Sequence, residues 1–145
     1  MTKIVVGVDG SAGGDAALQW AYEEAALRSA TLHLVHCWDY PYYGTMDAIG
    51  LDERFRAGVA EGAQALLDET VRKLAAEHPD GAVTVTSALE QGGSGASLLR
   101  AAEDAELLVV GSRGHGGFVG LLLGSVSNTV VAHAKVPVVV VHPPS

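Results

Sequence analysis

The stretch LLVVGSRGHGGFVGLLLGSVSN, residues 107–128, joins a short apolar run to a helical pattern through a long glycine-rich loop. The run Leu107–Val110 is wholly apolar, which is typical of a strand buried on both faces of a sheet. The helix that we expect over Ser125–Ala134 begins directly after Gly124. A buried strand, a loop and a helix form the repeating unit of a parallel sheet.

The same alternation extends over the rest of the chain. We expect strands at Lys3–Asp9, Thr31–Trp38, Val83–Leu89, Leu107–Val110 and Val136–Val141, and helices at Asp15–Arg28, Leu51–His78, Ala96–Asp104 and Ser125–Ala134. This order predicts an α/β fold, an open five-stranded parallel sheet with helices on both faces. Ligands of such sheets bind at the carboxyl ends of the strands, where the strand order reverses.

Length and composition narrow the possible partners. The chain of 145 residues fits a single domain over residues 1–145 and carries a net charge of −8. That charge argues against nucleic acid as the main partner, because such binding depends on Lys and Arg. The lone Cys37 excludes an internal disulfide and agrees with a cytoplasmic location. With neither a secretory leader nor a long apolar stretch, we expect no membrane association.

The beginning of the last expected helix is a candidate phosphate site. Ser125 is the expected N-cap, and the unpaired amides that follow carry partial positive charge. The hydroxyls of Ser125 and Ser127 would add donors. The P-loop lysine motif is absent from the sequence, and the first turn lacks dinucleotide-fingerprint spacing. From the residues alone, a long connection in which the glycines only make turns explains this segment as well as a phosphate site does.

The spacing Gly111-x2-Gly114-x9-Gly124-Ser125 resembles the nucleotide signature of the ATP-binding branch of the universal stress protein family. The segments IVVGVDGS (4–11), LVHCWD (34–39) and KVPVVVV (135–141) extend the resemblance over nearly the whole chain. The resemblance implies a Rossmann-like sheet in the order 3-2-1-4-5 and a homodimer. It also implies ATP as ligand, with Mg²⁺ or Mn²⁺ carried on the phosphates.

The resemblance also assigns site residues. Asp9 would lie at the ribose and adenine end, and the backbone around Gly7 and Cys37 near the base. The ribose and phosphates would be held by the signature residues Gly111, Gly114, Gly124 and Ser125, followed by Val126 and Ser127. From the residues themselves, Asp9 has a second possible role as a turn or helix cap, and we favour the ligand contact. Arg113 either binds phosphate oxygens or faces water.

Several other residues have structural interpretations. Ser11 is the expected cap of the first helix, and His33 and His36 point to opposite faces of one strand, which disfavours a shared metal site. Gly58 and Gly62 suggest close packing of the long helix against a neighbour. The aromatic segment Asp39–Gly50 fits a lid, a partner surface or local packing equally well.

These observations favour an ATP-binding stress-response regulator in which nucleotide occupancy, and not fast turnover, is the signal. A slow ATP hydrolase or nucleotidyl transferase is one alternative, and a dimeric stress protein that binds no nucleotide is another. A receiver domain is excluded, because the third strand ends in Ser87-Ala88-Leu89 and not in a phospho-accepting Asp. Pairing of Val136–Val141 with its copy would protect the sheet edge and create a homodimer.

Overall fold

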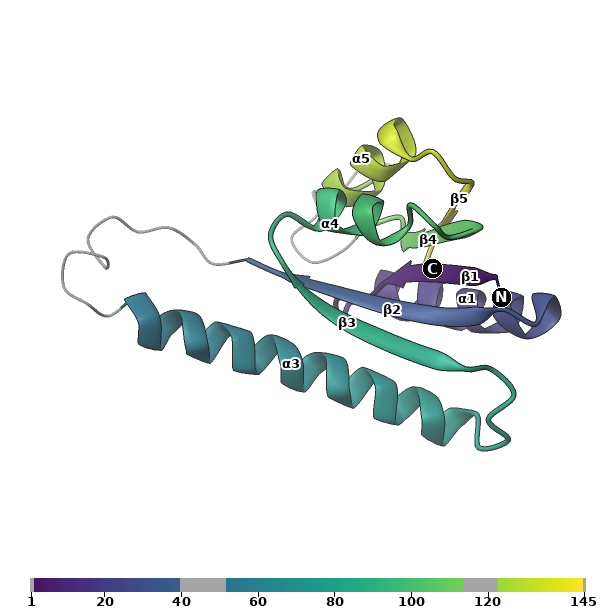
Figure 1. The fold of residues 1–145 in the computed structure, drawn as a ribbon, viewed down its shortest axis with the longest axis horizontal. Coiled ribbons are helices and arrows are strands. Elements are labelled where there is room, and N and C mark those ends of the chain that lie inside the picture. The colour runs from purple at the N-terminus through teal and green to yellow at the C-terminus, as the bar shows by residue number, and fades with distance from the viewer. Residues whose placement is uncertain (1, 40–51, 114–122, 145) are drawn as a thin grey trace.

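The computed structural model describes residues 2–39, 52–113 and 123–144. The strands are β1 (Lys3–Gly7), β2 (Thr31–Trp38), β3 (Val85–Gln91), β4 (Leu107–Gly111) and β5 (Val138–Val141), and the helices are α1 (Ala12–Arg28), α3 (Asp52–Glu77), α4 (Ser94–Ala101) and α5 (Ser125–His133). All strand pairs are parallel, and their order is β3-β2-β1-β4-β5 (Figure 1). The expected fold class and strand order are confirmed.

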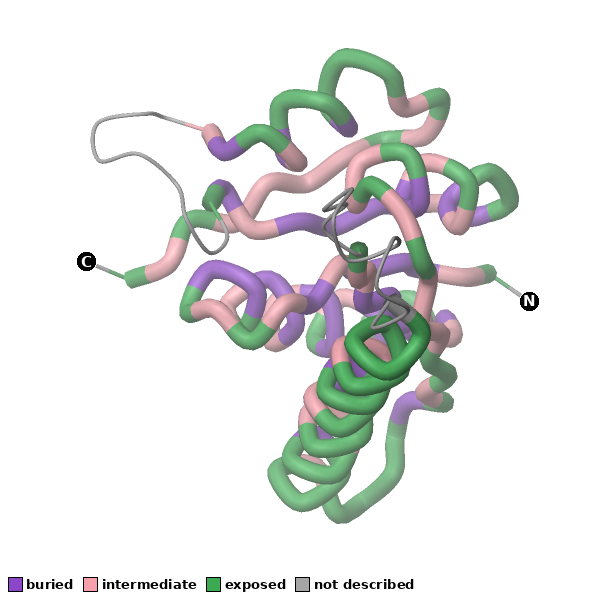
Figure 2. The backbone as a smooth tube through the Cα atoms, turned by 90° about the vertical axis from the view of Figure 1, so that its left-hand side faces the viewer, coloured by how far each residue is buried: buried purple, intermediate pink, exposed green. Residues whose placement is uncertain are grey.

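Two hydrophobic layers cover the sheet, one on each face. Helices α1 and α3 pack on one face and α4 and α5 on the other, and the burial pattern shows the central strands enclosed between them (Figure 2). Neighbouring β1 residues alternate between the layers: Ile4 and Val6 face α1, whereas Val5 faces α4. All three are fully buried, as the continuous apolar run predicts for a central strand.

The first helix begins earlier than expected. Ser11 is its N-cap, as predicted, and the Ser11 hydroxyl accepts a hydrogen bond from the Gly14 amide at 3.0 Å. Gly13 and Gly14, which precede the expected helix start at Asp15, are therefore helical. The N-cap hydrogen bond stabilises a first turn that glycine propensity alone disfavours.

Close backbone packing explains the glycine at position 13. A Cβ atom at Gly13 would overlap the carbonyl oxygen of Arg113. A Cβ atom at Gly111 would lie 2.7 Å from the carbonyl carbon and oxygen of Gly13. The first turn of α1 thus contacts the end of β4 backbone to backbone, which only glycine allows at either position.

The glycines of the long helix α3 do not make such close backbone contacts. A Cβ atom at Gly58 or Gly62 would meet no neighbour within 4 Å, so the expected close packing is wrong for the residues that the structure describes. Both glycines lie on a largely exposed part of the helix. Neither α3 nor any other helix in the described ranges has the length and apolarity needed to cross a bilayer.

The close contact at Gly111 predicts a large difference between two glycine substitutions. Gly111→Ala should lower the free energy of unfolding by about 1–3 kcal/mol, because the backbones must separate. Gly58→Ala should raise it by about 0.5–1 kcal/mol through helix propensity. Urea unfolding followed by circular dichroism measures both, and an unchanged midpoint for Gly111→Ala would contradict the packing argument.

Candidate functional site

The candidate site lies where the carboxyl ends of β1 and β4 meet. The two strands are direct neighbours, with Val6 opposite Val109. The chain leaves β1 into α1 on one face and leaves β4 toward α5 on the other face. This is the switch point at which open parallel sheets bind ligands, and it brings together the residues that directly follow β1 and β4.

The turn between β1 and α1 is organised by Asp9. Asp9 Oδ1 accepts hydrogen bonds from the amide of Ser11, at 2.9 Å, and from the Ser11 hydroxyl. The Ser11 hydroxyl in turn accepts from Gly14, so a continuous chain of bonds fixes the beginning of α1. Asp9 therefore has the capping role that we considered, and its described hydrogen bonds use only one of its two carboxylate oxygens.

Ser112 connects β4, β5 and the beginning of α5. The Ser112 amide donates to the carbonyl of Val141 at 2.9 Å, and the Ser112 carbonyl accepts from the Gly124 amide at 2.6 Å. The Ser112 side chain is 1% exposed, and within the described ranges its hydroxyl has no hydrogen-bond partner. We did not single out this residue from the sequence, although a small polar residue directly after a buried strand is a signal for such a position.

The beginning of α5 differs in two respects from our expectation. Gly124, and not Ser125, is the N-cap, and it contributes no side-chain cap bond. The Ser127 hydroxyl is buried and donates to the carbonyl of Ser112 at 2.9 Å, with the Gly124 carbonyl 3.1 Å away, so it is committed to holding the helix. The donors left for a ligand are the first amides of α5 and the exposed Ser125 hydroxyl.

The two helix starts at this edge differ in charge. The first turn of α1 follows Asp9 and contains Asp15, whereas the first turn of α5 holds no acidic residue. The positive end of the α5 dipole is therefore not neutralised by a carboxylate of its own first turn, so an anion is favoured there. The Asp9 carboxylate, which precedes α1, instead favours a ligand group that donates a hydrogen bond, such as a hydroxyl.

Gly7 and Cys37 face α4. A Cβ atom at Gly7 would lie 2.9 Å from Cδ1 of Leu98. The sulfur of Cys37 lies 3.9 Å from the carbonyl oxygen of Ser94, and burial raises the pKa of this thiol. Because their side-chain directions are taken up by α4, these two positions can offer only backbone groups to a ligand at the edge.

The remaining candidates lie at or beyond the limits of the described ranges. Arg113 is exposed. Gly114 lies outside the described residues, as do the tyrosines of the segment Asp39–Gly50. His36 Nδ1 lies 2.8 Å from the carbonyl oxygen of Val8, and His33 faces the other side of the sheet. The described residues contain no group of three or more His, Cys, Asp or Glu side chains able to hold a metal ion.

Comparison with known proteins identifies relatives over nearly the full chain. The model of the universal stress protein family matches residues 1–142. A curated universal stress protein of Mycolicibacterium smegmatis is 37% identical over 144 residues, which cover 97% of this chain and 45% of the relative. This chain thus spans less than half the length of the curated relatives that it matches.

Two solved structures illustrate the structural likeness. UspA from Lactobacillus plantarum shares 23% identity at a TM-score of 0.80, with 97% of each chain covered. A universal stress protein in complex with cAMP shares 26% identity at a TM-score of 0.60, with 99% of this chain and 98% of that chain covered. At its identity, the first of these shows the fold alone.

Two serines at the beginning of α5 should behave differently when replaced. Ser127→Ala should lower the free energy of unfolding by about 1 kcal/mol, because it leaves the Ser112 carbonyl with one partner fewer. Ser125→Ala removes an exposed hydroxyl and should stay within about 0.5 kcal/mol of the wild type. Thermal or urea unfolding compares the two variants, and equal effects would show that the Ser127 bond does not hold the helix.

Proposed function

Since this chain belongs to the universal stress protein family, we propose that it binds ATP at the joined carboxyl ends of β1 and β4. The observation that carries this proposal is the charge difference between the starts of α1 and α5, which lie on opposite faces of the sheet. The start of α5 has neither a side-chain cap bond nor an acidic residue, which suits phosphates, and the Asp9 carboxylate suits ribose hydroxyls. A bound nucleotide would therefore have a single preferred orientation, with its phosphates at α5 and its ribose at Asp9.

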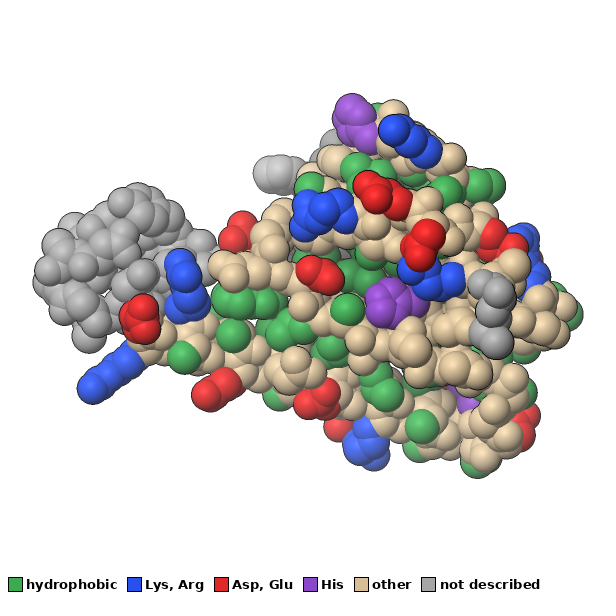
Figure 3. Space-filling view, viewed as in Figure 1, with side chains coloured by type: hydrophobic (Ala, Val, Ile, Leu, Met, Phe, Trp, Pro, Cys, Tyr) green, Lys and Arg blue, Asp and Glu red, His purple; other side chains and the backbone are tan. Residues whose placement is uncertain are grey.

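Three further observations support a nucleotide as the ligand. The spacing of Gly111, Gly114, Gly124 and Ser125 resembles the family's ATP signature. A relative at 26% identity was solved with cAMP, which is also an adenine nucleotide. On the face drawn in Figure 3, basic and acidic side chains of the described residues are interspersed, which fits a small ligand better than a nucleic acid.

In this proposal Mg²⁺ or Mn²⁺ would accompany ATP on its phosphates and on water. Magnesium usually binds proteins in this way, through few protein ligands and several waters. The described residues offer backbone amides and the Ser125 hydroxyl at the beginning of α5, and these groups can donate hydrogen bonds to phosphate oxygens. When bound, the ion would neutralise phosphate charge, while Ser125, Val126 and Ser127 would hold the phosphates through their amides.

We further propose that occupancy is the signal and that turnover is slow. The beginning of α5 presents backbone amides and the Ser125 hydroxyl, none of which is a general base. Asp9 already accepts two hydrogen bonds from Ser11. ATP binding would instead tie the β1 turn to α5 across the edge of the sheet. A regulated partner would then distinguish the nucleotide-bound from the nucleotide-free form at the carboxyl ends of β1 and β4.

A charge placed at the beginning of α5 tests the site directly. Ser125→Asp should weaken Mg-ATP binding at least about tenfold, because the carboxylate would repel the phosphates at close range. The variant should fold normally, since an acidic residue in the first turn stabilises a helix. Ala65→Glu adds the same charge at an exposed position of α3 and should leave the affinity for Mg-ATP unchanged. Isothermal titration calorimetry measures all three affinities, and chromatography of denatured protein measures bound nucleotide.

The outcomes separate the proposal from its alternatives. No nucleotide in the purified protein and no heat on adding millimolar Mg-ATP would contradict it and favour a stress protein that acts through dimer contacts. Equal affinity of Ser125→Asp and the wild type would place the nucleotide elsewhere. Turnover well above the spontaneous rate, lost in Ser125→Asp, would make the protein an ATP hydrolase.

We also propose a homodimer formed through the last strand, Val136–Val141. The amides of Leu108 and Ser112 donate to the carbonyls of Pro137 and Val141. The backbone groups of the odd-numbered residues of the last strand are therefore directed toward β4. Residues 138 and 140 then present their backbone groups outward, on an edge that is unpaired within the described residues. Pairing with a second copy would satisfy these groups.

Light scattering tests the dimer. At micromolar concentration the wild type should show twice the 14.9 kDa chain mass. Val140→Pro should give the mass of a single chain, because it removes an outward N–H while leaving the bonds to β4 in place. A wild-type mass of one chain, or a dimer that persists in Val140→Pro, would contradict pairing through β5.

A further inference from the structure

The strand β3 forms one outer edge of the sheet and, within the described residues, pairs only with β2. The carbonyl of Thr84 accepts a hydrogen bond from the Leu32 amide, and the Gly92 amide donates to the carbonyl of Trp38. The backbone groups of even-numbered residues in this segment are therefore directed toward β2. Those of the odd-numbered residues in 85–91 are directed outward, because successive residues of a strand alternate in this respect.

This edge lacks the features that usually protect an outer strand. Such strands are commonly short, carry Lys or Pro, or contain a bulge. β3 has seven residues, against four in β5, and its sequence VTSALEQ contains neither Lys nor Pro. Its register with β2 runs without interruption from Val85 to Gln91. β3 therefore offers a regular edge with which a further strand can pair.

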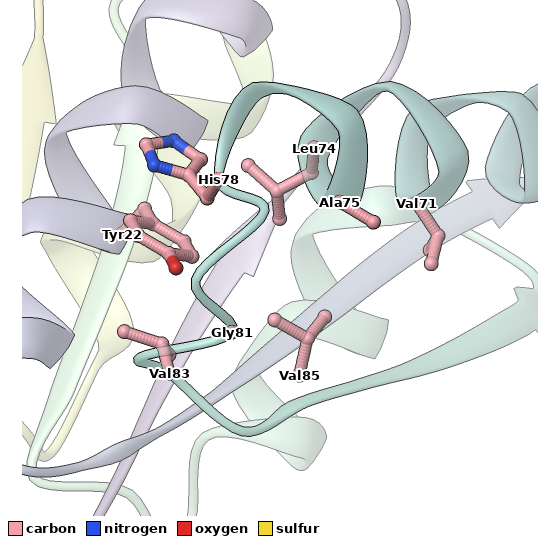
Figure 4. Close-up of a pocket in the computed structure, with 8 residues that line it drawn as sticks. All are labelled: Tyr22, Val71, Leu74, Ala75, His78, Gly81, Val83 and Val85. Atoms are coloured by element: carbon pink, nitrogen blue, oxygen red, sulfur yellow. The ribbon is translucent and has the colours of Figure 1, made fainter.

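An open hollow lies beside the beginning of this edge, between α1, the last turns of α3 and β3 (Figure 4). Its volume is about 170 Å³, and its lining includes the stacked rings of Tyr22 and His78. Figure 4 shows Val85 pointing toward α3, and Val71 and Ala75 pointing back toward β3. Because Ala75 is exposed, the hollow can receive an apolar side chain from the surface.

Apolar surface continues along the edge. Val71, Val85 and Leu89 pack against the core on the α1 side of the sheet and remain partly exposed. On the face drawn in Figure 3, hydrophobic side chains form a band between β3 and α3. An added strand with apolar residues at alternate positions would cover this band and remove it from water.

The elements that border the edge are acidic. Residues 52–91 contain eight Asp and Glu residues and four Lys and Arg residues, so this segment accounts for half of the net charge of −8. Arg72 is paired with Glu69, with 2.8 Å between Nε and Oε2. The excess of carboxylates favours a partner that carries basic residues next to its apolar positions.

We propose that the β3 edge binds an extended segment of a partner protein, apolar at alternate positions and flanked by basic residues. Its backbone would pair with the outward N–H and C=O groups of Val85, Ser87 and Leu89. One of its apolar side chains would enter the hollow. In this mode of recognition, backbone bonds supply affinity and pockets for alternate side chains supply specificity. β2 separates this edge from β1, so the partner would bind apart from the proposed nucleotide.

A synthetic peptide tests the pairing on the wild-type protein. It has seven residues, with valine at the second, fourth and sixth positions, threonine between them and lysine at both blocked ends. We expect saturable chemical-shift changes at the amides of Val85, Ser87 and Leu89, with a dissociation constant at or below about 1 mM. Hydrogen exchange of these amides should slow on binding, since no described strand pairs with them. Absence of saturable changes would overturn the proposal.

Two methylated peptides separate backbone pairing from apolar contact. One carries N-methyl groups on its valines and the other on its threonines, so both keep all side chains. Exactly one of them should bind at least about tenfold more weakly than the parent peptide, because the backbone groups of alternate residues face β3. Equal affinities of the two peptides would overturn the proposal.

The charge of the flanks is tested in the same titration. A peptide with glutamate in place of both lysines should bind at least about fivefold more weakly at low ionic strength, and added salt should reduce this difference. Equal affinities at low salt would overturn the assignment of a basic partner.

Ser87→Pro makes the corresponding change in the protein. It removes one outward N–H and keeps the bonds to β2, since proline is tolerated on edge strands. It should weaken peptide binding at least about fivefold, whereas Ser87→Ala keeps the amide and should bind as the wild type does. Circular dichroism checks that both variants are folded, and equal affinities of the two would contradict pairing at this edge.

A matched pair of variants tests the hollow. Ala75→Lys places a long charged side chain there and should weaken peptide binding at least about tenfold. Ala76→Lys adds the same charge at the next residue of α3, which is exposed and does not line the hollow, and should change binding less than about twofold. Equal affinities would show that no peptide side chain enters the hollow and would overturn this part of the proposal.

A second copy of this chain is the competing occupant of the edge. Pairing of two β3 strands would protect the amides of Ser87 and Leu89 in the free protein, and Ser87→Pro would lower the mass measured by light scattering. That result would overturn the proposal. We expect unprotected amides, and the same mass and Mg-ATP affinity for Ser87→Pro and the wild type.

Discussion

The backbone contact between the first turn of α1 and the end of β4 is the constraint on which the candidate site depends. Gly13 lies against Arg113, and Gly111 lies against Gly13, at separations that leave no room for a side chain. This contact holds the first turn of α1 against the carboxyl end of β4, at the switch point of the sheet. Together with the pairing of β1 and β4, it fixes where the chain turns into α1 relative to the residues that follow β4.

The fold was predictable from the sequence because its signals are local and repeated. Nearly continuous apolar runs marked β1, β4 and β5, and helical spacing marked the crossovers between strands. Strand order is not a local property, and it came from the resemblance to a family. The structure confirms both, with the bounds of most elements shifted by one to three residues, which is the usual behaviour of helix and strand ends.

The details of the site were less predictable, since they depend on contacts between distant segments. Ser127 was expected to offer its hydroxyl to a phosphate, but the carbonyl of Ser112, fifteen residues away, takes it. The glycines of α3 and those at positions 13 and 111 look alike in sequence, and only packing shows that the latter pair is sterically required. Composition identified the glycine-rich edge, and tertiary contacts then decided which of its groups remain available to a ligand.

The central claim is that one nucleotide bridges the β1 turn and the beginning of α5. Amide chemical shifts during a titration with Mg-ATP test this claim most directly. The account predicts that the largest changes fall on two groups of residues together, Asp9–Ser11 and Ser125–Ser127, with the stretch Gly111–Arg113 between them. Changes confined to one group, or to the far end of α3, would contradict it.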